Sequence, residues 1–362
     1  MEHSLQCEES AIVSRKPAPV HSPKNPREHV NSFTLLRLIL AALVIVAHAA
    51  ELTDRGNSRE TFHLLGGKLS AGEFAVEAFF MVSGYLVLQS WSRRPKLSAY
   101  LSKRVLRIVP AFVAAYLISA LLVGWLGGGP DYLAELFQSS GILKLLSGLT
   151  LLKPPSTPPV FAGSPYPMVN GALWTITYEF RCYLLIPILA ACGFYSNRLL
   201  FAIGWLAVVL GAGFYSVAHL RDAMSLGLLR FLPFFLAGNV AYLYRDRLRW
   251  NRVAGCLCIA AAALSMGSLA ATRFVLPIFG SYAILWLALS ECSPLRFVSP
   301  SYDISYGVYL YGWPTQKLLL WYFPTITLGF QMVLTLSLSM FLGWASWYLI
   351  ETRCLALKTR FK

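Results

Sequence analysis

The chain has 362 residues, of which 56% are hydrophobic, and it carries a formal net charge of +14. Soluble domains use apolar residues for about half of their sequence or less, so this composition excludes a soluble globular protein and predicts a polytopic membrane protein. The Lys and Arg residues lie in short clusters between apolar runs, where they set topology and meet anionic lipid headgroups. We therefore expect membrane lipids, and no nucleic acid, as partners of the basic residues.

The cysteines and the polar N-terminal segment give no sign of a secreted or metal-binding protein. The seven cysteines lie mostly in apolar runs, and the Cys256-x-Cys258 pair lacks the second pair that a zinc site requires. Residues 1–31 are polar, contain prolines and have no apolar signal-peptide core. We expect no metal, no disulfide framework and a flexible cytoplasmic tail over 1–31.

Apolar runs of spanning length recur along the chain and predict an all-α membrane protein with about ten transmembrane helices. The runs cover residues 33–53, 73–92, 105–126, 171–193, 198–217, 225–244, 253–270, 273–290, 304–322 and 328–350. A stretch rich in Gly, Pro and Ser over 127–170 is expected to be a long extracytoplasmic connection with room for a short helix near 138–152. The transmembrane domain is expected over 32–353, followed by a short basic cytoplasmic tail over 354–362.

The distribution of Lys and Arg predicts the orientation, because short cytoplasmic loops concentrate basic residues. With the N-terminus inside, the cytoplasmic side collects Arg15, Lys16, Lys24, Arg27, Arg93, Arg94, Lys96, Lys103, Arg104, Arg107, Arg198, Arg245, Arg247, Arg249, Arg252, Arg296, Arg353, Lys358, Arg360 and Lys362. The opposite side receives Arg55, Arg59, Lys68, Lys144, Lys153, Arg221 and Arg273. Both termini are therefore expected to be cytoplasmic. No internal repeat is visible, which weakens an inverted-repeat transporter interpretation without removing it.

The first apolar run carries Arg37 and His48 with ten apolar residues between them, RLILAALVIVAH. On a helix the two side chains return to nearly the same face, about 16 Å apart along the axis. Ionisable groups inside a membrane are costly and indicate function by default. An imidazole in a dry site is expected to be neutral and can then accept a proton as a general base.

The second run contains two acids one helical turn apart, in GEFAVEAFFMVSGY. Their spacing places Glu73 and Glu77 on one face, near the outer end of the predicted helix. Glu73 is expected to be interfacial and solvated, whereas the deeper Glu77 is expected to pair with a cation or with His48. Gly84 next to Ser83 indicates close packing between helices.

The segment RVLRIVP places Arg104 and Arg107 three residues apart at the cytoplasmic mouth of the third predicted helix. This spacing points two guanidinium groups the same way, which suits the binding of phosphates. Ordinary positive-inside anchoring explains the same two residues equally well.

Two later segments combine aromatic and polar residues. In NGALWTITYEFRCYLL, Trp174 is typical of the membrane interface, and Glu179 is the more deeply placed acid. In ISYGVYLYGWPTQ, Pro314 is expected to kink the helix and to free a backbone carbonyl, while Tyr309 and Tyr311 are expected to pack.

Together these segments resemble the acyltransferase-3 family of integral membrane O-acyltransferases, which modify O-antigens and exopolysaccharides. The family's Arg-x10-His signature falls on Arg37 and His48. Four further elements follow in order, on Gly72, Glu77, Phe79, Phe80, Ser83 and Gly84; on Arg104, Arg107 and Pro110; on Trp174 and Glu179; and on Ser305, Tyr306, Tyr309, Leu310, Trp313 and Pro314. Five elements in order are a specific signal, and they cover nearly the whole membrane part.

The chain departs from the family pattern at three places. The position before the Trp-Pro pair, often histidine in the family, is Gly312, so any role of that second histidine is absent here. The closing Glu-Lys-Pro pattern is Glu351-Thr352-Arg353, which keeps the acid but loses the proline. Many relatives carry an extracytoplasmic esterase-like domain after the last helix, and this chain ends at Lys362.

The resemblance implies that acyl-CoA, and acetyl-CoA in particular, enters from the cytoplasm. The acyl group would move to a hydroxyl of a polysaccharide or lipid-linked glycan beyond the bacterial inner membrane. With the spacing arguments above, it assigns catalysis to His48, Arg37, Glu179 and Glu77; donor binding to Arg104, Arg107, Ser83 and Tyr306; and the acceptor side to Trp174 and Glu73. In this scheme His48 is the general base, Glu77 or Glu179 either fixes its tautomer or acts on the acceptor, and a covalent acyl-histidine is the less favoured version. A transporter or flippase, or a non-catalytic partner of a glycan-export system, is the alternative.

Overall fold

The computed structural model describes residues 32–54, 56, 59–218, 227–297 and 302–357. The predicted tail over 1–31 and the last residues of the predicted basic tail, 358–362, lie outside the described residues. Every regular element in the described part of the chain is helical, which confirms the all-α prediction.

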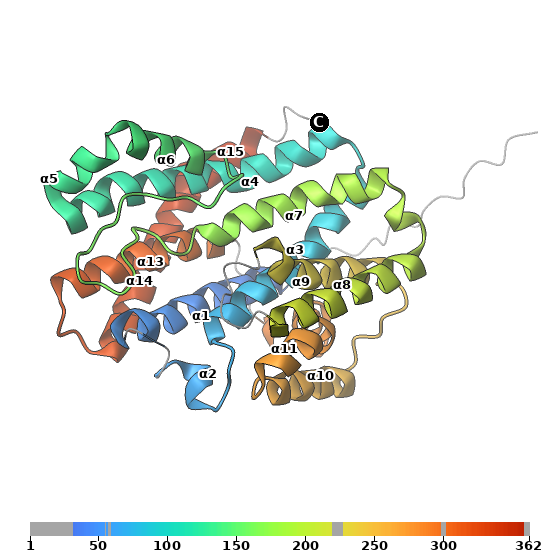
Figure 1. The fold of residues 1–362 in the computed structure, drawn as a ribbon. Helices are drawn as coiled ribbons and strands as arrows, with labels where there is room; N and C mark the ends of the chain where they lie inside the picture. The colour runs from blue at the N-terminus through green and yellow to red at the C-terminus, as the bar shows by residue number, and fades with distance from the viewer. Residues whose placement is uncertain (1–31, 55, 57–58, 219–226, 298–301, 358–362) are drawn as a thin grey trace, which may run out of the picture. The chain divides into compact units, whose positions relative to one another are not determined.

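The helices are arranged as Figure 1 shows. Their bounds are α1 Phe33–Asp54, α2 Thr61–Leu64, α3 Ala71–Arg93, α4 Leu97–Leu117, α5 Gly124–Leu136, α6 Ser139–Leu149, α7 Trp174–Ala191, α8 Arg198–Ala218, α9 Leu228–Leu243, α10 Arg252–Ser265, α11 Leu269–Val275, α12 Ser281–Leu289, α13 Ser305–Tyr322, α14 Leu328–Ser346 and α15 Thr352–Ala356. Three wide π-helical turns join consecutive helices, at η1 Ile118–Val123, η3 Leu276–Gly280 and η5 Trp347–Glu351. Two 3₁₀ turns lie at η2 Phe194–Ser196 and η4 Pro294–Phe297.

Six helical segments of the described chain are long and apolar enough to cross a membrane. They are Phe33–Asp54, Ala71–Arg93, Leu97–Leu136, Arg198–Ala218, Leu269–Leu289 and Leu328–Ala356. Helices α7, α9, α10 and α13 also lie over predicted runs, but α9 and α10 have only 16 and 14 residues. The count of ten spans and the orientation of the termini therefore stay predictions.

The long connection is more helical than its composition suggested. Helix α5 continues to Leu136 across a kink at Gly129, and α6 covers 139–149, close to the short helix expected near 138–152. The irregular part is thus the stretch 150–173, which we call the outer connection.

The centre of the membrane domain is built on α3, which lies against α1, α7 and α9. Two glycines allow α3 and α9 to approach closely. A Cβ atom at Gly84 would lie 2.0 Å from the carbonyl oxygen of Phe235, and one at Gly238 would lie 2.2 Å from that of Met81. The prediction that Gly84 is a packing residue is confirmed.

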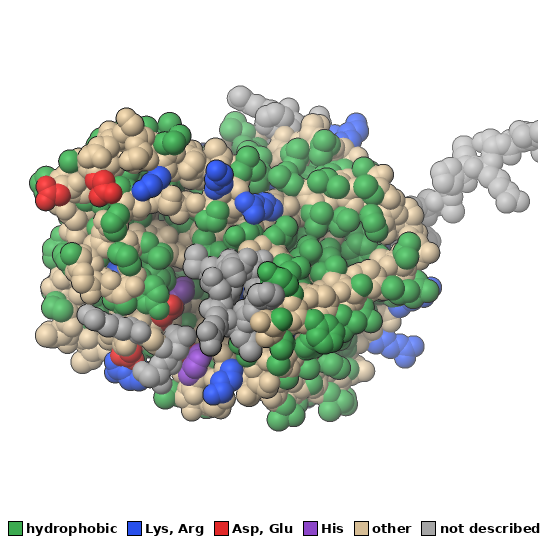
Figure 2. Space-filling model, viewed as in Figure 1, with side chains coloured by type: hydrophobic (Ala, Val, Ile, Leu, Met, Phe, Trp, Pro, Cys, Tyr) green, Lys and Arg blue, Asp and Glu red, His purple; other side chains and the backbone are tan. Residues whose placement is uncertain are grey.

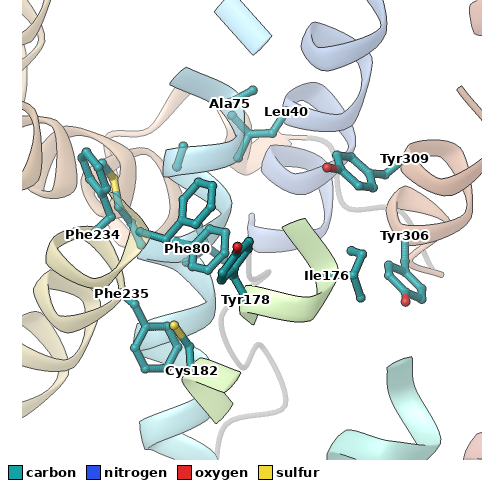
Figure 3. Packing of buried hydrophobic residues seen from close by; sticks show 14 of the residues in the cluster. Leu40, Ala75, Phe80, Ile176, Tyr178, Cys182, Phe234, Phe235, Tyr306 and Tyr309 are labelled. Carbon is teal, nitrogen blue, oxygen red and sulfur yellow. The ribbon is translucent and has the colours of Figure 1, made fainter. Parts of the chain in front are cut away.

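Aromatic side chains fill the region where α3, α7 and α9 meet. Phe80 stacks on Phe231 with 4.3 Å between ring centroids. Figure 3 shows Phe80, Tyr178, Phe234 and Phe235 gathered there, while Ile176 of α7 faces tyrosines of α13. This packing holds α7 between the α3–α9 pair and α13.

The outer helices present apolar surface. Phe214 of α8 is 66% exposed, and Phe330 and Phe341 of α14 are 61% and 62% exposed. Figure 2 shows hydrophobic side chains spread widely over one face of the molecule. Such a surface suits the hydrocarbon of a bilayer and would be unfavourable in water.

Helix α14 turns a row of small and polar residues inward. Its buried positions are Gln331, Thr335, Ser339, Gly343 and Ser346. The wide turn η5 follows, and the next buried position is Glu351. This turn places a carboxylate inside the end of the helix bundle.

Candidate functional site

Four charged side chains form a network that joins α1, α4, α13 and the end of α14; we call it the clamp. Arg37 donates to Asp303 Oδ2 at 2.6 Å. Arg107 donates to the same oxygen at 2.7 Å and to Glu351 Oε2 at 2.9 Å. Glu351 is only 2% exposed. Arg37 and Arg107 are thus brought together through one shared carboxylate, that of Asp303, while Glu351 bonds Arg107 alone.

Asp303 lies outside the helices, two residues before Ser305. Burial alone would raise its pKa, but the guanidinium groups of Arg37 and Arg107 and two hydrogen bonds from Ser305 hold the pKa below its ordinary value. The carboxylate is therefore ionised and bridges the two arginines. Sequence analysis missed this residue, although it stands only two residues before the expected Ser-Tyr element.

Arg104 lies one turn from Arg107 but is much less engaged. Its described contacts are a 3.3 Å hydrogen bond to Ser90 and a cation–π contact at 5.8 Å from the ring centroid of Tyr183. Its Nε atom has no partner. Arg104 is thus the arginine of the pair that is available to an anionic ligand.

A cavity extends from the clamp toward the middle of the domain, with an empty volume of about 400 Å³ that includes the open solvent at its mouth. Its lining includes Arg37, Phe79, Phe80, Thr175, Ile176, Glu179, Ser305, Tyr306 and Tyr309. Glu179 accepts hydrogen bonds from Ser83 and from Tyr183, each at 2.6 Å. Tyr306 donates to the carbonyl of Ile108 at 3.1 Å. Three expected site residues, Arg37, Glu179 and Tyr306, therefore line this cavity, and Ser83 is hydrogen-bonded to one of them, Glu179.

His48 lies toward the other end of α1, where its side chain is 20% exposed. Its Nδ1 atom lies 3.0 Å from Glu51 Oε2. The ring of Trp313 packs edge-on against the imidazole, with 4.8 Å between centroids. Trp313 stands one turn beyond Tyr309 of the cavity lining, but neither Trp313 nor His48 is among the residues that line the cavity.

The expectation that Glu77 or Glu179 holds the imidazole is wrong. Glu179 bonds Ser83 and Tyr183, and Glu77 accepts from Arg273 at 2.8 Å. The partner of His48 is Glu51, three residues further along the same helix. The i, i+3 spacing was the available signal, because such residues are neighbours on a helix.

Glu73 and Glu77 belong to a second, separate charge cluster between α3, α9 and α11. Arg230 donates to Glu73 at 2.9 Å and lies 3.5 Å from Glu77, which is fully buried. Glu77 therefore pairs with cations, one of its two expected alternatives. Glu73 also closes a capping box with Ser70, so its carboxylate is engaged and is not simply solvated.

Trp174 is placed at the start of α7, as expected. Its ring lies 5.7 Å from that of Tyr178 and 5.6 Å from that of Phe231. These contacts put the indole in the aromatic packing beside α9, and the structure gives it no contact with His48.

The outer connection is fastened over the His48 end of the domain. The buried Lys317 of α13 donates to Ser164 and, at 2.8 Å, to the carbonyl of Tyr166. The Tyr166 ring packs edge-on against Trp313 with 5.9 Å between centroids. The same indole thus separates Tyr166 from His48.

Among the described residues, no group of three or more His, Cys, Asp or Glu side chains is placed to hold a metal ion. The site offers an imidazole–carboxylate pair, a cavity and a basic mouth.

Comparison with known proteins gives three findings. A family model described as an acyltransferase domain matches residues 30–351. An O-acetyl transferase of Shigella phage Sf6 is 31% identical over 341 residues, which cover 90% of this chain and 96% of that protein. Nodulation protein 10 of Rhizobium leguminosarum bv. viciae is 33% identical over 177 residues, 44% of either chain. No solved structure matches the chain.

Proposed function

Because the chain belongs to the acyltransferase-3 family of integral membrane O-acyltransferases, we propose that it moves an acetyl group from cytoplasmic acetyl-CoA to a hydroxyl of a carbohydrate beyond the membrane. Its similarity to the phage protein identifies it as an O-acetyltransferase. The proposal adds the donor, the acceptor class and residence in a bacterial inner membrane. The observation that supports it most is a cavity that Arg37 of the clamp lines, with the His48–Glu51 pair further along the same helix α1.

The donor is proposed to bind at the clamp end, which the distribution of basic residues predicts to be cytoplasmic. Arg104 has free donors there, whereas Arg107 already bonds two carboxylates. We therefore assign a phosphate of the coenzyme to Arg104, since guanidinium groups bind phosphate strongly. The apolar and tyrosine lining of the cavity suits an uncharged pantetheine arm and its thioester.

His48 is proposed to act as the general base. With Nδ1 held by a carboxylate, Nε2 is the atom that can take the proton of an acceptor hydroxyl. The hydroxyl oxygen attacks the thioester carbonyl carbon, the carbon–sulfur bond breaks, and the departing thiolate finally takes the proton. The products are an O-acetyl ester and free coenzyme A, so no covalent enzyme intermediate is required.

The acceptor is proposed to approach from the His48 end, where the imidazole is partly exposed. A glycan chain or a lipid-linked saccharide can reach a partly exposed imidazole there without crossing the bilayer. The relative named as a nodulation protein is compatible with this class of acceptor and does not specify the sugar.

The test is His48→Ala in membranes that contain the native glycan, with labelled acetyl-CoA as donor. General acid–base catalysis contributes about 10²–10⁴-fold, so we expect at least a hundredfold loss of acetyl transfer at a normal protein level. His63→Ala is the matched control, because His63 forms a similar i, i+3 pair with Glu60. Full transfer by His48→Ala would refute the role of the imidazole. Substrate flux without consumption of the thioester would favour a transporter instead.

A further inference from the structure

We propose that Glu51 is the positioning residue of the reaction, which holds the imidazole of His48 in the one tautomer and orientation that leave Nε2 free for the acceptor hydroxyl. This inference rests on the proposed function and adds a residue to it. Glu51 follows His48 by three positions on α1 and stands outside the five elements of the family pattern noted above.

The hydrogen bond between Glu51 and His48 determines which ring nitrogen carries the proton. Glu51 Oε2 lies 3.0 Å from His48 Nδ1. An ionised carboxylate only accepts hydrogen bonds, so the ring proton must be on Nδ1. The lone pair is then on Nε2. A carboxylate in this place also stabilises the imidazolium that forms during proton transfer, as in the serine-protease triad.

The carboxylate of Glu51 is itself held in place by a residue of the outer connection. The Tyr166 hydroxyl of the outer connection lies close enough to Glu51 to interact with its carboxylate. Tyr166 in turn is fixed through its carbonyl by Lys317 and through its ring by Trp313. An ordinary helix-surface pair would have no such support and would contribute only a few tenths of a kcal/mol.

The imidazole of His48 and the ring of Tyr166 both pack against the indole of Trp313. Trp313 packs edge-on against His48 on one side and edge-on against Tyr166 on another. Three segments of the chain, α1, α13 and the outer connection, therefore restrain the imidazole. Preorganised groups of this kind are what keep a general base within reach of its substrate.

Other titratable groups near the pair are few. The outer connection brings Tyr166, α13 brings Lys317, and α3 brings Glu73, whose carboxylate is bonded to Arg230. Helix α14 presents neutral Gln331 at this end. A change in the acidic side of the pH–rate profile can therefore be assigned to the His48–Glu51 pair.

The experiment compares Glu51→Gln with wild type in the glycan-containing membranes, with labelled acetyl-CoA as donor. Glutamine keeps the shape but loses the charge. We expect the rate of transfer to fall about 10- to 100-fold, a share of what general base catalysis contributes, while the KM for acetyl-CoA changes less than about twofold. The acidic limb of the pH–rate profile should move to lower pH, because the charge that stabilises the imidazolium is gone.

Two further variants make the result specific. Glu51→Asp keeps the charge on a side chain one methylene shorter and should lose less activity than Glu51→Gln. In a His48→Ala background, Glu51→Gln should cause no further loss, because a positioning residue acts through the group it positions. His63→Ala again serves as the control for loss of an i, i+3 imidazole–carboxylate pair.

A wild-type rate and an unchanged acidic limb for Glu51→Gln would overturn the inference, provided that His48→Ala is inactive. An active His48→Ala would count against the proposed base instead. Should Glu51→Gln fail to accumulate, Glu51→Ala is measured in the same way, since a wild-type rate and pH–rate profile for a variant without the carboxylate would also count against the inference.

Discussion

Arg104 and Arg107 stand one turn apart, yet the structure predicts opposite phenotypes for their removal. Arg107 donates to Glu351 at 2.9 Å and to Asp303 at 2.7 Å. Arg107→Ala leaves the 2%-exposed Glu351 without a described cation partner. Removing one member of a buried ion pair costs about 3–5 kcal/mol, so this variant should be strongly destabilised.

Arg104→Ala removes a 3.3 Å hydrogen bond to Ser90 and a cation–π contact with Tyr183, and should change stability far less than Arg107→Ala. If Arg104 binds a phosphate of the donor, its loss removes a charge-assisted hydrogen bond of about 1.5–3 kcal/mol. That corresponds to about a 10- to 150-fold weaker interaction with acetyl-CoA. The expected signature is a raised KM for acetyl-CoA with a normal unfolding temperature.

The assay measures the unfolding temperature in detergent and the acetyl-CoA dependence of transfer in membranes, for both variants. Arg93→Ala is the control, because Arg93 is exposed at the same end. We expect Arg107→Ala to unfold at a clearly lower temperature and Arg104→Ala to be altered only in KM. Equal stability for the two variants, with equally raised KM values, would refute the inference that Arg107 stabilises the fold while Arg104 binds the donor. Both arginines would then be assigned to a single phosphate-binding site.

Two further predictions concern packing and acid stability. Gly84→Ala should destabilise the domain by at least about 1–3 kcal/mol, because its Cβ would meet the backbone of Phe235, whereas Gly204→Ala, with open space around it, should be neutral in the same thermal unfolding assay. Asp303→Asn should lower the unfolding temperature at neutral pH. Since the pKa of Asp303 is lowered in the fold, the contribution of its carboxylate to stability is present above about pH 4 and is lost as the pH falls below that value. The unfolding temperatures of wild type and variant should therefore converge at low pH, and a difference that stays constant with pH would contradict the argument.

The sequence predicted the fold class and most helix positions because apolar runs of spanning length leave few alternatives. A helix lies over each expected run, but four of these helices are too short or too polar to be identified as spans by length and composition. The 127–170 stretch was expected to be mostly irregular because of its glycines and prolines. Packing of α5 and α6 against each other and against α13 overrides that local preference.

The site was predictable where its residues share one helix and unpredictable where they do not. The spacing of Arg37 and His48 predicts that they share one face of a helix. The i, i+3 spacing of His48 and Glu51 could have predicted their contact in the same way. Asp303 and Glu351 contact Arg107 across 196 and 244 positions of the chain, and no local pattern contains that information. The partners of Glu77 were missed for the same reason, since Arg273 lies 196 positions away.

Because of the wide turn η5, the position of Glu351 in the clamp depends on the number of residues between Ser346 and Glu351. The buried row on α14 advances in steps of three or four and reaches Ser346, so a regular helix would turn residue 350 inward next. The π-helical turn adds one residue and presents Glu351 in its place. A homologous helix one residue shorter and regular throughout would present its acid at the same point in space. An alignment of such homologues that allows no gap over residues 347–350 would therefore match the wrong residue with Glu351, whose carboxylate binds Arg107.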